Sequence, residues 1–491
     1  MAHRDRWASR ATFLLASFGS AIGLGNLWRF PMIAYDNGGG AFLIPYIAAL
    51  LTAGIPLMML EFALGQQFQK STPGSFREVG RKWEFVGWWA LGVGTIIVLY
   101  YAVIMAWAWD YLAFSLREGW KGDPQGFFDR FLGLTEGPGR MGGIRWAAVA
   151  GLALTWGSMY WIIKRGVFRV GKVVLFTVPI PIILTLVLAI RGITLPGAVE
   201  GLKYYLTPDF SALLRGQTWL AAYGQVFFSL SLGFGILTAY ASYQPRNSDI
   251  TNNAFLTSLA DTGYAYLAGF AVFATLGYLA TAQGVPVSEV ARGGPSLAFV
   301  IYPTAISLMP FAPVIGVLFF LTLLTLGIDS AFSIVEAAVA GMRDKWKVSQ
   351  ERTTAWFCLF GFLGGLVFTT GAGLYWLDIV DQWMNNYGLV VIGLLECVMV
   401  GWFYGTRKLR EYINEVSDFR VGWWWDFFIR WLTPAALGVA LVTTLAQEFR
   451  APYGDYPTWA LMVGGWSILA IIIVAAAVVT SLPARAGRKE A

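Results

Sequence analysis

A carboxylate inside a long apolar run is the residue most able to do chemistry in this sequence. Asp329 lies within the charge-poor stretch 311–342. A carboxylate in such surroundings costs about 3 kcal/mol or more unless a partner compensates its charge. A hard cation such as sodium is a suitable partner, because it needs several oxygen ligands and a break in a helix frees backbone carbonyls to supply them. Asp329 therefore points to cation binding.

Glycine-rich interruptions occur in two of the apolar segments, at corresponding places. The first segment contains Gly19, Gly23 and Gly25, and the sixth contains Ser229-Leu-Ser-Leu-Gly-Phe-Gly235. Glycine destabilises a helix interior by about 1 kcal/mol. Paired interruptions of this kind are typical of transporters built from two inverted halves. Spacing alone leaves a second interpretation open, in which the glycines only allow helices to pack closely.

Other chemistries find little support among the residue types. The only histidine is His3, in the amino-terminal tail, which argues against zinc sites and histidine-based catalysis within the apolar segments. Cys358 and Cys397 both fall within apolar segments and do not suggest a disulfide framework. No nucleophile–base pair is visible in these segments, so we expect no enzyme activity.

The elements that position these residues are predicted to be membrane-spanning helices. Of the 491 residues, 57% are hydrophobic and only 13% are charged, against about a quarter charged in soluble proteins. We predict an all-α polytopic membrane protein with twelve spans. The approximate spans are 8–33, 41–66, 86–116, 143–163, 167–191, 218–243, 252–282, 311–342, 353–371, 376–404, 427–447 and 457–482.

The basic residues predict the orientation. With both termini in the cytoplasm, the inner connections and tails contain 24 of the 35 Lys and Arg residues and the outer connections contain 10, while Arg29 lies within a span. This satisfies the positive-inside rule, so the net charge of +6 reflects topology and not nucleic-acid binding. We expect a multi-pass protein of the plasma (inner) membrane, without a cleaved signal peptide.

We predict one transporter domain over 1–491, made of a first five-helix repeat (8–191), a second, inverted repeat (218–404) and two accessory helices (427–482). The outer connection 117–142 has the turn chemistry of a loop, and 283–310 is expected to fold back as a short hairpin. The partner expected of these spans is the lipid bilayer; the family resemblance given below adds a neutral amino acid and sodium ions. We expect a monomer or a weak homodimer.

Several motifs resemble those of the neurotransmitter:sodium symporter family, in order along essentially the whole chain. They are Arg6-Trp-Ala-Ser-Arg10, Gly23-Leu-Gly-Asn-Leu-Trp-Arg-Phe-Pro31, Asn37-Gly-Gly-Gly40, Tyr100-Tyr101, Phe228-Ser-Leu-Ser-Leu-Gly-Phe-Gly235 and Gly327-Ile-Asp-Ser330. The resemblance implies a bacterial amino-acid carrier with the leucine-transporter-type fold, in which helices 1 and 6 are unwound at mid-membrane. It also implies sodium-coupled symport by alternating access.

The resemblance further implies two sodium sites. The first would be formed by the Ala21 carbonyl, the Asn26 side chain, Ser229 and Asp261, and completed by the carboxylate of the substrate. The second would be formed by carbonyls of Gly19, Ile22 and Leu326 and by the side chains of Asp329 and Ser330. A lone serine in a helix more often bonds back to the preceding turn, so Ser229 and Ser330 carry this interpretation only within the motif.

The same resemblance implies a pocket for an amino acid. Its carboxylate would meet the amides near Leu24 and Gly25 and the Tyr101 hydroxyl, and its amino group would meet carbonyls near Ala21, Phe228 and Ser231. Monoamine-carrying relatives have an Asp at the position of Gly23, so its absence favours a substrate with its own carboxylate. The residues expected to bind substrate are Ser20, Ala21, Leu24, Gly25, Ile97, Tyr101, Phe228, Ser229, Ser231, Phe234, Ser330, Ser333 and Ile334. Because the side-chain pocket carries no charge, we expect a small to medium neutral, aliphatic L-amino acid.

Chloride is not expected to be required. Animal members bind it near the positions of Tyr46, Gln225 and Ser229, whereas some chloride-independent bacterial members have a Glu at the position of Ala265. Here Asp261 lies one helical turn before Ala265 and brings a negative charge to the same face.

Two gates complete the implied mechanism. Arg29 and Asp381 would form the outer gate, bridged by water when it is open. Arg4 and Asp344 would form the inner gate, with Trp7 packed as a plug and Tyr243 nearby. Gly171 and Pro181 have a spacing that the family associates with unwinding of the fifth helix and a water path to the second sodium site. Two alternatives are compatible with the sequence. The chain could be a channel or nutrient sensor of the same fold, or a transporter coupled to protons through Asp261 or Asp329.

Overall fold

The computed structural model describes residues 5–484, in which helices joined by turns and loops are the regular structure and β-pairing is limited to isolated bridges. Ten of its helices are long and apolar enough to cross a membrane. Those in the first half of the chain are Gly40–Phe68 (including α4, Leu43–Ala49, and α5, Ile55–Phe68), Arg81–Ser115 (η3, Arg81–Trp83, and α7, Glu84–Ser115), Trp146–Ile163 (α9) and Val167–Ile193 (α10, Val167–Thr177, and α11, Pro179–Ile193). They are followed by Thr251–Gln283 (α15), Ala312–Trp346 (α19), Gln350–Thr369 (including α20, Gln350–Gly365) and Gly373–Tyr404 (α21, Gly373–Trp383; η7, Met384–Leu389; α22, Val390–Val398; η8, Met399–Tyr404). The last two are Trp423–Arg450 (α24, Trp423–Phe427; η9, Phe428–Leu432; α25, Thr433–Arg450) and Thr458–Ser481 (including α27, Ile468–Ser481).

The first predicted span is a broken helix. Its arms, α1 (Arg10–Ala21) and the pair α2 (Leu24–Trp28) and α3 (Phe30–Asp36), meet at an angle of 50°. Gly23 has an extended backbone (φ −128°, ψ −170°), and its N–H donates to Asn26 Oδ1 over 3.0 Å. This side-chain cap satisfies one of the amides that a new helix leaves without a partner, so the second arm starts at once.

The sixth predicted span is broken more widely. Its arms are α13 (Gly216–Ser229) and α14 (Ile236–Ala241), separated by the non-helical segment 230–235. Ser231, Gly233 and Gly235 have positive φ angles of 56°, 77° and 75°, a conformation that favours glycine at two of the three positions. Each arm is too short to cross a membrane alone. Ten continuous helices and the bent first pair therefore account for eleven of the twelve predicted spans in the described chain.

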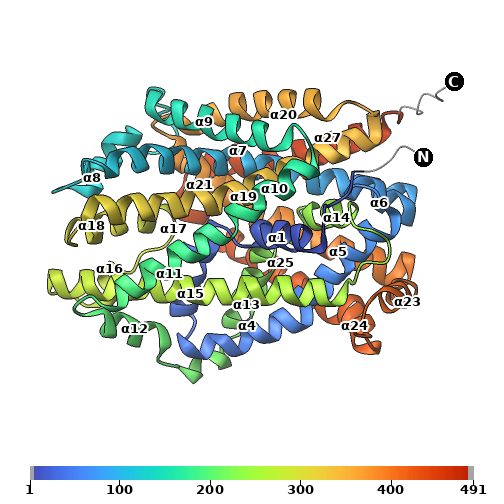
Figure 1. Ribbon diagram of the computed structural model, residues 1–491, viewed down its shortest axis with the longest axis horizontal. Helices are drawn as coiled ribbons and strands as arrows, with labels where there is room; N and C mark the ends of the chain where they lie inside the picture. Colours follow the sequence, from blue (N-terminus) through green and yellow to red (C-terminus); the bar gives the residue numbers. More distant parts are fainter. Residues whose placement is uncertain (1–4, 485–491) are drawn as a thin grey trace.

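The helices run roughly side by side, and the short connecting helices gather at the two ends of the molecule (Figure 1). The connections predicted to be cytoplasmic, with α6 (Thr72–Val79) and α23 (Thr406–Val416), lie at one end. Those predicted to be outside, with α8 (Pro124–Leu132), α12 (Ala198–Leu206), α16 (Val287–Val290) and α18 (Tyr302–Ser307), lie at the other. This arrangement agrees with the orientation derived from the basic residues.

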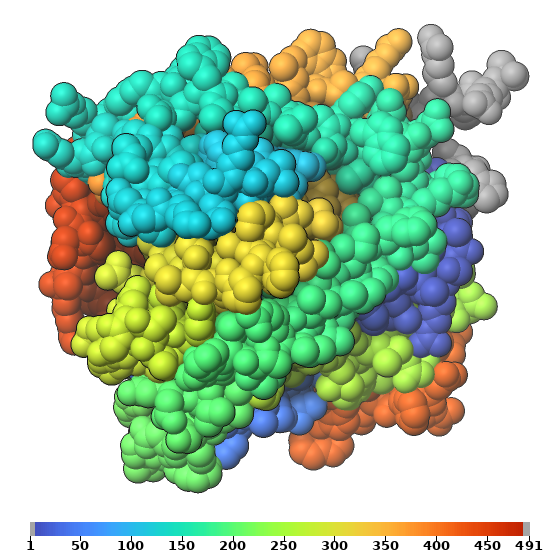
Figure 2. Space-filling model, turned by 60° about the vertical axis from the view of Figure 1, so that its left-hand side comes forward, coloured from blue at the N-terminus to red at the C-terminus, as the bar shows by residue number. Residues whose placement is uncertain are grey.

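The outer surface of the bundle is apolar where lipid would contact it. Figure 2 shows the Val167–Ile193 helix lying diagonally across one face. Along it, Phe176 is 69% exposed, Ile183 58% and Ile190 57%. Such exposure of large apolar side chains suits hydrocarbon and not water.

The core helices hold the broken segments in place. α7 packs along α19, and α1 packs against α10, α15 and α19. The outer arm α13 packs on α4, and the inner arm α14 packs on α5, so both arms contact one continuous helix.

One sequence expectation about the connections was wrong. The 117–142 connection contains the nine-residue helix α8, which we had predicted as a loop. Asp123 caps it by accepting a hydrogen bond from the Gly126 N–H at 2.9 Å, and Pro124 occupies the first helical turn. These residues favour a helix start as much as a turn. The 283–310 connection contains several short helices.

Candidate functional site

The two helix breaks lie against each other in the centre of the bundle. The Ser231 hydroxyl, from the second break, donates to the carbonyl of Ser20, at the end of α1, over 2.8 Å. The carbonyl of Ser20 has lost its helical partner because α1 ends at Ala21, and the hydroxyl replaces it. The breaks are therefore joined directly.

A cavity of about 110 Å³ lies between the breaks, α7, α19 and α21. It is lined by all but one of the predicted substrate residues, namely Ser20, Ala21, Leu24, Gly25, Ile97, Tyr101, Phe228, Ser229, Ser231, Phe234, Ser330 and Ile334. The exception is Ser333, which is fully buried outside the lining and donates its hydroxyl to the Ser330 carbonyl over 2.7 Å. Gly23, Trp28, Tyr100, Ile104 and Ile236 also line the cavity. Ile104 lies two helical turns after Ile97 on α7, so the helical period indicates that both side chains face the cavity.

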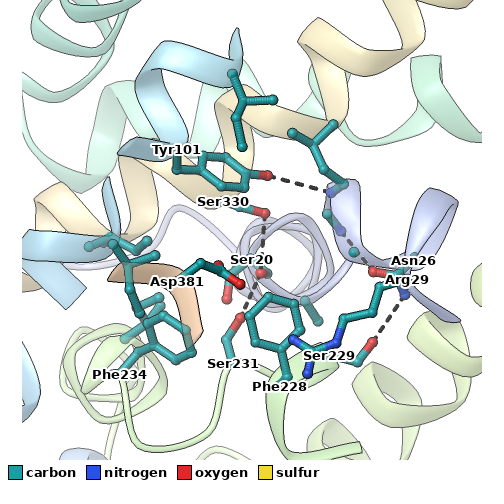
Figure 3. Close-up of a pocket in the computed structure, with 18 of the residues that line it drawn as sticks. Ser20, Asn26, Arg29, Tyr101, Phe228, Ser229, Ser231, Phe234, Ser330 and Asp381 are labelled. Atoms are coloured by element: carbon teal, nitrogen blue, oxygen red, sulfur yellow. Dashed lines mark hydrogen bonds between the residues drawn. The ribbon is translucent and has the colours of Figure 1, made fainter. Parts of the chain in front are cut away.

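The hydroxyls of Tyr101, Ser330 and Ser231 lie around the first helix break, with the Phe234 ring farther from it (Figure 3). The Tyr101 hydroxyl lies 3.4 Å from the Leu24 N–H, within hydrogen-bonding distance of the first amide of α2. The Ser330 hydroxyl lies 3.4 Å from the Gly19 carbonyl oxygen and 3.5 Å from that of Ser20. The cavity therefore offers hydroxyls beside free helix-end groups, with Ile97, Phe234 and Ile334 supplying an apolar wall.

The residues predicted for the first sodium site form a closed hydrogen-bonded triangle. Asn26 Nδ2 donates to Asp261 Oδ1 over 2.7 Å and lies 3.1 Å from Ser229 Oγ. The Ser229 hydroxyl lies 2.8 Å from Asp261 Oδ2 and 3.0 Å from Oδ1. All three side chains are buried, and Ala21 lines the adjoining cavity. The structure thus brings these residues together around a carboxylate that α15 supplies.

The residues predicted for the second sodium site meet where α1 ends. A Cβ atom on Gly19 would lie 2.9 Å from Asp329 Oδ2, so this glycine allows the carboxylate to approach the break. Asp329 Oδ1 is buried and has no hydrogen-bond partner within the described part of the chain. Ile22 follows the end of α1 directly, and Leu326 lies on α19 nearly one turn before Asp329 and Ser330. Burying a carboxylate oxygen without a hydrogen-bond donor is energetically costly, and a cation bound beside it would offset that cost.

The residues of the predicted outer gate share the cavity but do not touch. The Arg29 guanidinium carbon lies 4.6 Å from the centre of the Phe228 ring. Across the cavity, Asp381 accepts hydrogen bonds from the Tyr100 hydroxyl at 2.7 Å and from Asn385 Nδ2 at 2.8 Å. No ion pair within 4.0 Å joins Arg29 to Asp381 in the described residues.

The predicted inner gate is described only in part, because Arg4 lies outside the described residues. Trp7 is buried and donates from Nε1 to the Tyr240 carbonyl over 2.9 Å. The backbone carbonyl of Tyr243 accepts a hydrogen bond from the Trp7 N–H over 3.3 Å, and the Tyr243 hydroxyl donates one to Glu336 Oε1 over 2.9 Å. Asp344 accepts from the Ser71 N–H over 2.6 Å. Trp7 therefore packs against the α14 end of the sixth segment, at Tyr240 and Tyr243.

Glu61, an acidic residue within the apolar segment 41–66, was predicted to be structural and not an ion ligand. Its Oε1 atom accepts the N–H of Gly233 over 2.9 Å, inside the second break. A buried backbone amide without a partner is costly, so Glu61 stabilises the non-helical segment. An acidic residue in an apolar helix was the only signal available.

Comparison with known proteins identifies the family. The sequence profile of the sodium:neurotransmitter symporter family matches residues 4–125 and 120–484. The chain belongs to this family. It is 43% identical over 477 residues to an uncharacterized sodium-dependent transporter of Methanocaldococcus jannaschii, covering 96% of each chain.

Animal relatives are more distant but also match over most of their length. The chain is 34% identical to the sodium- and chloride-dependent GABA transporter 2 of Bos taurus, over 93% of this chain and 83% of that one. It is 33% identical to the sodium-dependent dopamine transporter of Caenorhabditis elegans, over 94% and 84% respectively. This symporter is accordingly a sodium-dependent, multi-pass membrane transporter and not an enzyme, as predicted.

Proposed function

We propose that this symporter carries a small to medium neutral L-amino acid, aliphatic in preference, into the cell together with sodium. The cavity between the two helix breaks is the observation that carries the proposal, because its lining is divided between polar groups near the first break and the apolar side chains of Ile97, Phe234 and Ile334. An amino acid has the same division into a charged backbone and an apolar side chain. The names of its relatives include GABA and dopamine carriers, so family membership by itself does not choose the substrate.

Gly23 supports a substrate that brings its own carboxylate. A Cβ atom at this position would lie 2.8 Å from Ser330 Oγ, too close for an ordinary contact. An acidic side chain at this point of the cavity would have to displace Ser330. The negative charge beside the first sodium site would then come from the substrate, whose carboxylate the Leu24 amide and the Tyr101 hydroxyl are placed to receive.

Sodium coupling follows from the position of the two proposed ion sites at the breaks. Asn26, Ser229 and Asp261, with the Ala21 carbonyl, would bind the first ion, and the substrate carboxylate would complete its shell. Gly19, Ile22, Leu326, Asp329 and Ser330 would bind the second. The substrate carboxylate would be part of the first sodium site, and that sodium ion would be part of the substrate site. Substrate and sodium therefore increase each other's affinity by the same factor.

Chloride is not required in this proposal. The Asp261 carboxylate belongs to the proposed first sodium site, and both of its oxygens are hydrogen-bonded to Asn26 or Ser229. It would provide the charge that chloride brings elsewhere.

Transport would proceed by alternating access in a fold of two inverted five-helix repeats and two accessory helices. The broken sixth segment, 218–243, would be the twelfth span. Arg29 and Asp381 would close the outer side, and the Trp7 region with Arg4 and Asp344 the inner side. The stretch from Gly171 to Pro181, which spans the junction of α10 and α11, would loosen to release the second sodium ion.

Uptake by purified protein in liposomes tests the proposal. A panel of labelled solutes would include alanine, leucine, GABA, taurine and dopamine, driven by an inward gradient of sodium, of potassium or of protons. We expect uptake of aliphatic amino acids with sodium alone. Uptake of GABA or dopamine in preference to leucine, or uptake driven by protons without sodium, would refute it.

A further inference from the structure

A second buried carboxyl group lies near the interruption in the sixth segment. Glu61 accepts the Gly233 N–H there over 2.9 Å, and α22 supplies Glu396. Both acidic residues are fully buried, with 0% of each exposed. Neither lines the substrate cavity or belongs to the two proposed sodium sites. The protein therefore carries two acidic side chains at this break that the proposed function does not use.

The side of the helical run that carries Glu396 packs on the interrupted segment. A Cβ atom on Gly233 would lie 3.3 Å from the Leu389 carbonyl oxygen. One on Gly393 would lie 2.4 Å from the Phe227 ring, near the end of α13. Gly393 follows Leu389 by four residues and precedes Glu396 by three, so the three lie on one side of the helix. Glu396 is therefore on the side that faces the break.

The two carboxyl groups are close enough to interact electrostatically, but they differ in the donors around them. Oε1 of Glu61 accepts the Gly233 N–H, and a hydrogen bond of this kind favours the ionised form of a carboxyl group. Neither oxygen of Glu396 has a hydrogen-bond partner among residues 5–484, and Oε2 of Glu61 has none either. The local structure thus supports a negative charge on Glu61 and offers nothing that would stabilise one on Glu396.

The surrounding helices do not supply a balancing cation. α5 packs against α6, α14, α15, α23 and η9, and α22 packs against α7, α25 and the segments η7, η8 and η9. Among the described residues of these elements, no Lys or Arg lies within 4.0 Å of either carboxyl group. The titratable groups within electrostatic reach are the two carboxyl groups themselves and Cys397, the neighbour of Glu396 in the chain.

Two negative charges in these surroundings would be very costly. Burying one ionised carboxylate without a partner costs several kcal/mol, and such a group becomes neutral by binding a proton. A second negative charge nearby adds repulsion, so two carboxyl groups that share a buried site do not both ionise. A doubly charged pair would also attract a cation to the second break, in competition with the proposed sodium sites. A bound proton removes both problems.

We propose that Glu396 binds a proton and stays a neutral carboxylic acid, while Glu61 keeps the negative charge. The proton is taken up from water as an O–H bond on one Glu396 oxygen. It gives the pair a hydrogen-bond donor where Oε2 of Glu61 has none. Glu61 can then hold the Gly233 amide, and with it the shape of the break, while the pair carries a single charge. This proton site goes beyond the proposed transport function and does not depend on the substrate.

Infrared difference spectroscopy of the full-length protein in detergent, at neutral pH, tests this assignment. A protonated carboxyl group has a C=O stretching band that is separate from the bands of a carboxylate and shifts when D₂O replaces H₂O. The variant E396Q is compared with D378N, a matched control in the same helical run. Asp378 accepts hydrogen bonds from the Tyr453 and Tyr456 hydroxyls at 3.0 and 2.9 Å, so we expect it to be ionised. E396Q should lose one protonated carboxyl band, and D378N should lose none.

A further variant, E61Q, locates the proton within the pair. It removes the charge next to Glu396, so the Glu396 band should shift and remain. The proposal is overturned if E396Q loses no such band, because Glu396 is then ionised or paired with a metal cation. It is equally overturned if the band disappears in E61Q and persists in E396Q, because the proton then belongs to Glu61.

Thermal unfolding between neutral and alkaline pH gives an independent readout. In the unfolded chain a Glu side chain ionises above about pH 4.3. The folded protein keeps a proton on Glu396 at neutral pH, so its stability falls once the pH is high enough to remove that proton. E396Q has no such proton, and we expect its unfolding midpoint to match that of the unaltered protein at neutral pH and to exceed it at alkaline pH. An E396Q protein that does not fold, or that is much less stable at every pH, would overturn the proposal, since it would show that a charge is needed at this position.

Discussion

Substituting Asp261 by asparagine tests the chemistry at the first proposed sodium site. The carboxylate accepts from Asn26 Nδ2 at 2.7 Å and from Ser229 Oγ at 2.8 Å. Hydrogen bonds to a charged group contribute about 1.5–3 kcal/mol and those to a neutral group about 0.5–1.5 kcal/mol. Two weakened bonds therefore cost about 2–3 kcal/mol, which corresponds to about 30- to 150-fold in affinity.

The assay is sodium-dependent uptake into liposomes, measured in gluconate and in chloride. In gluconate we expect the half-saturating sodium concentration of Asp261→Asn to rise by at least about 30-fold. Chloride should restore part of this loss, because the anion returns a negative charge beside the ion. The unaltered protein should transport equally in both media, and Asp261→Glu, which keeps the charge, should remain independent of chloride. The reasoning is refuted if Asp261→Asn keeps its normal sodium dependence in gluconate, or if the unaltered protein loses uptake there.

Three further predictions concern other parts of the bundle. Lys345 is buried and its Nζ lies 2.7 Å from Glu84 Oε1, while Arg77 lies 3.5 Å from the other carboxylate oxygen. Lys345→Ala removes one charged hydrogen bond and leaves Glu84 the weaker partner, which should cost about 1.5–3 kcal/mol, seen as a lower thermal unfolding midpoint; an unchanged midpoint contradicts it. A Cβ atom on Gly65 would lie 2.0 Å from the Thr238 carbonyl oxygen, so Gly65→Ala should abolish the monodisperse peak in size-exclusion chromatography, and a normal peak would disprove this packing. Pro181→Ala should slow sodium release to the inside severalfold in single-turnover measurements, an idea that fails if the rate does not change.

Much of the site was predictable because its chemistry is unusual for a membrane. A buried carboxylate such as Asp329 has few explanations in an apolar helix, and paired glycine interruptions mark places where helices end. The structure brings Asp329 to the end of α1 beside Gly19. It also brings Asp261 to Asn26 and Ser229, which come from two other segments. Spacing alone does not reveal that triangle, and only the family motifs pointed to it.

Other details of the site depend on placements that the sequence does not show. Ser330 and Ser333 are three residues apart on α19, so they share a face, yet the Ser333 hydroxyl bonds back to the Ser330 carbonyl and leaves the cavity lining. The sequence does not distinguish these two fates of a serine. Arg29 and Asp381 were predicted as a gate bridged by water when open, and the structure places both at one cavity without a direct ion pair in the described residues. How far apart such residues lie depends on how helices from distant parts of the chain are placed.

The attachment of the broken sixth segment has a mechanical consequence. Its outer arm packs on α4 and its inner arm on α5, and these belong to one unbroken helix, Gly40–Phe68. Because one continuous helix packs against both arms, the arms cannot bend toward each other at the break. The interruption at 230–235 therefore keeps its shape and exposes backbone groups, while α13, α14 and the Gly40–Phe68 helix move together as one rigid body.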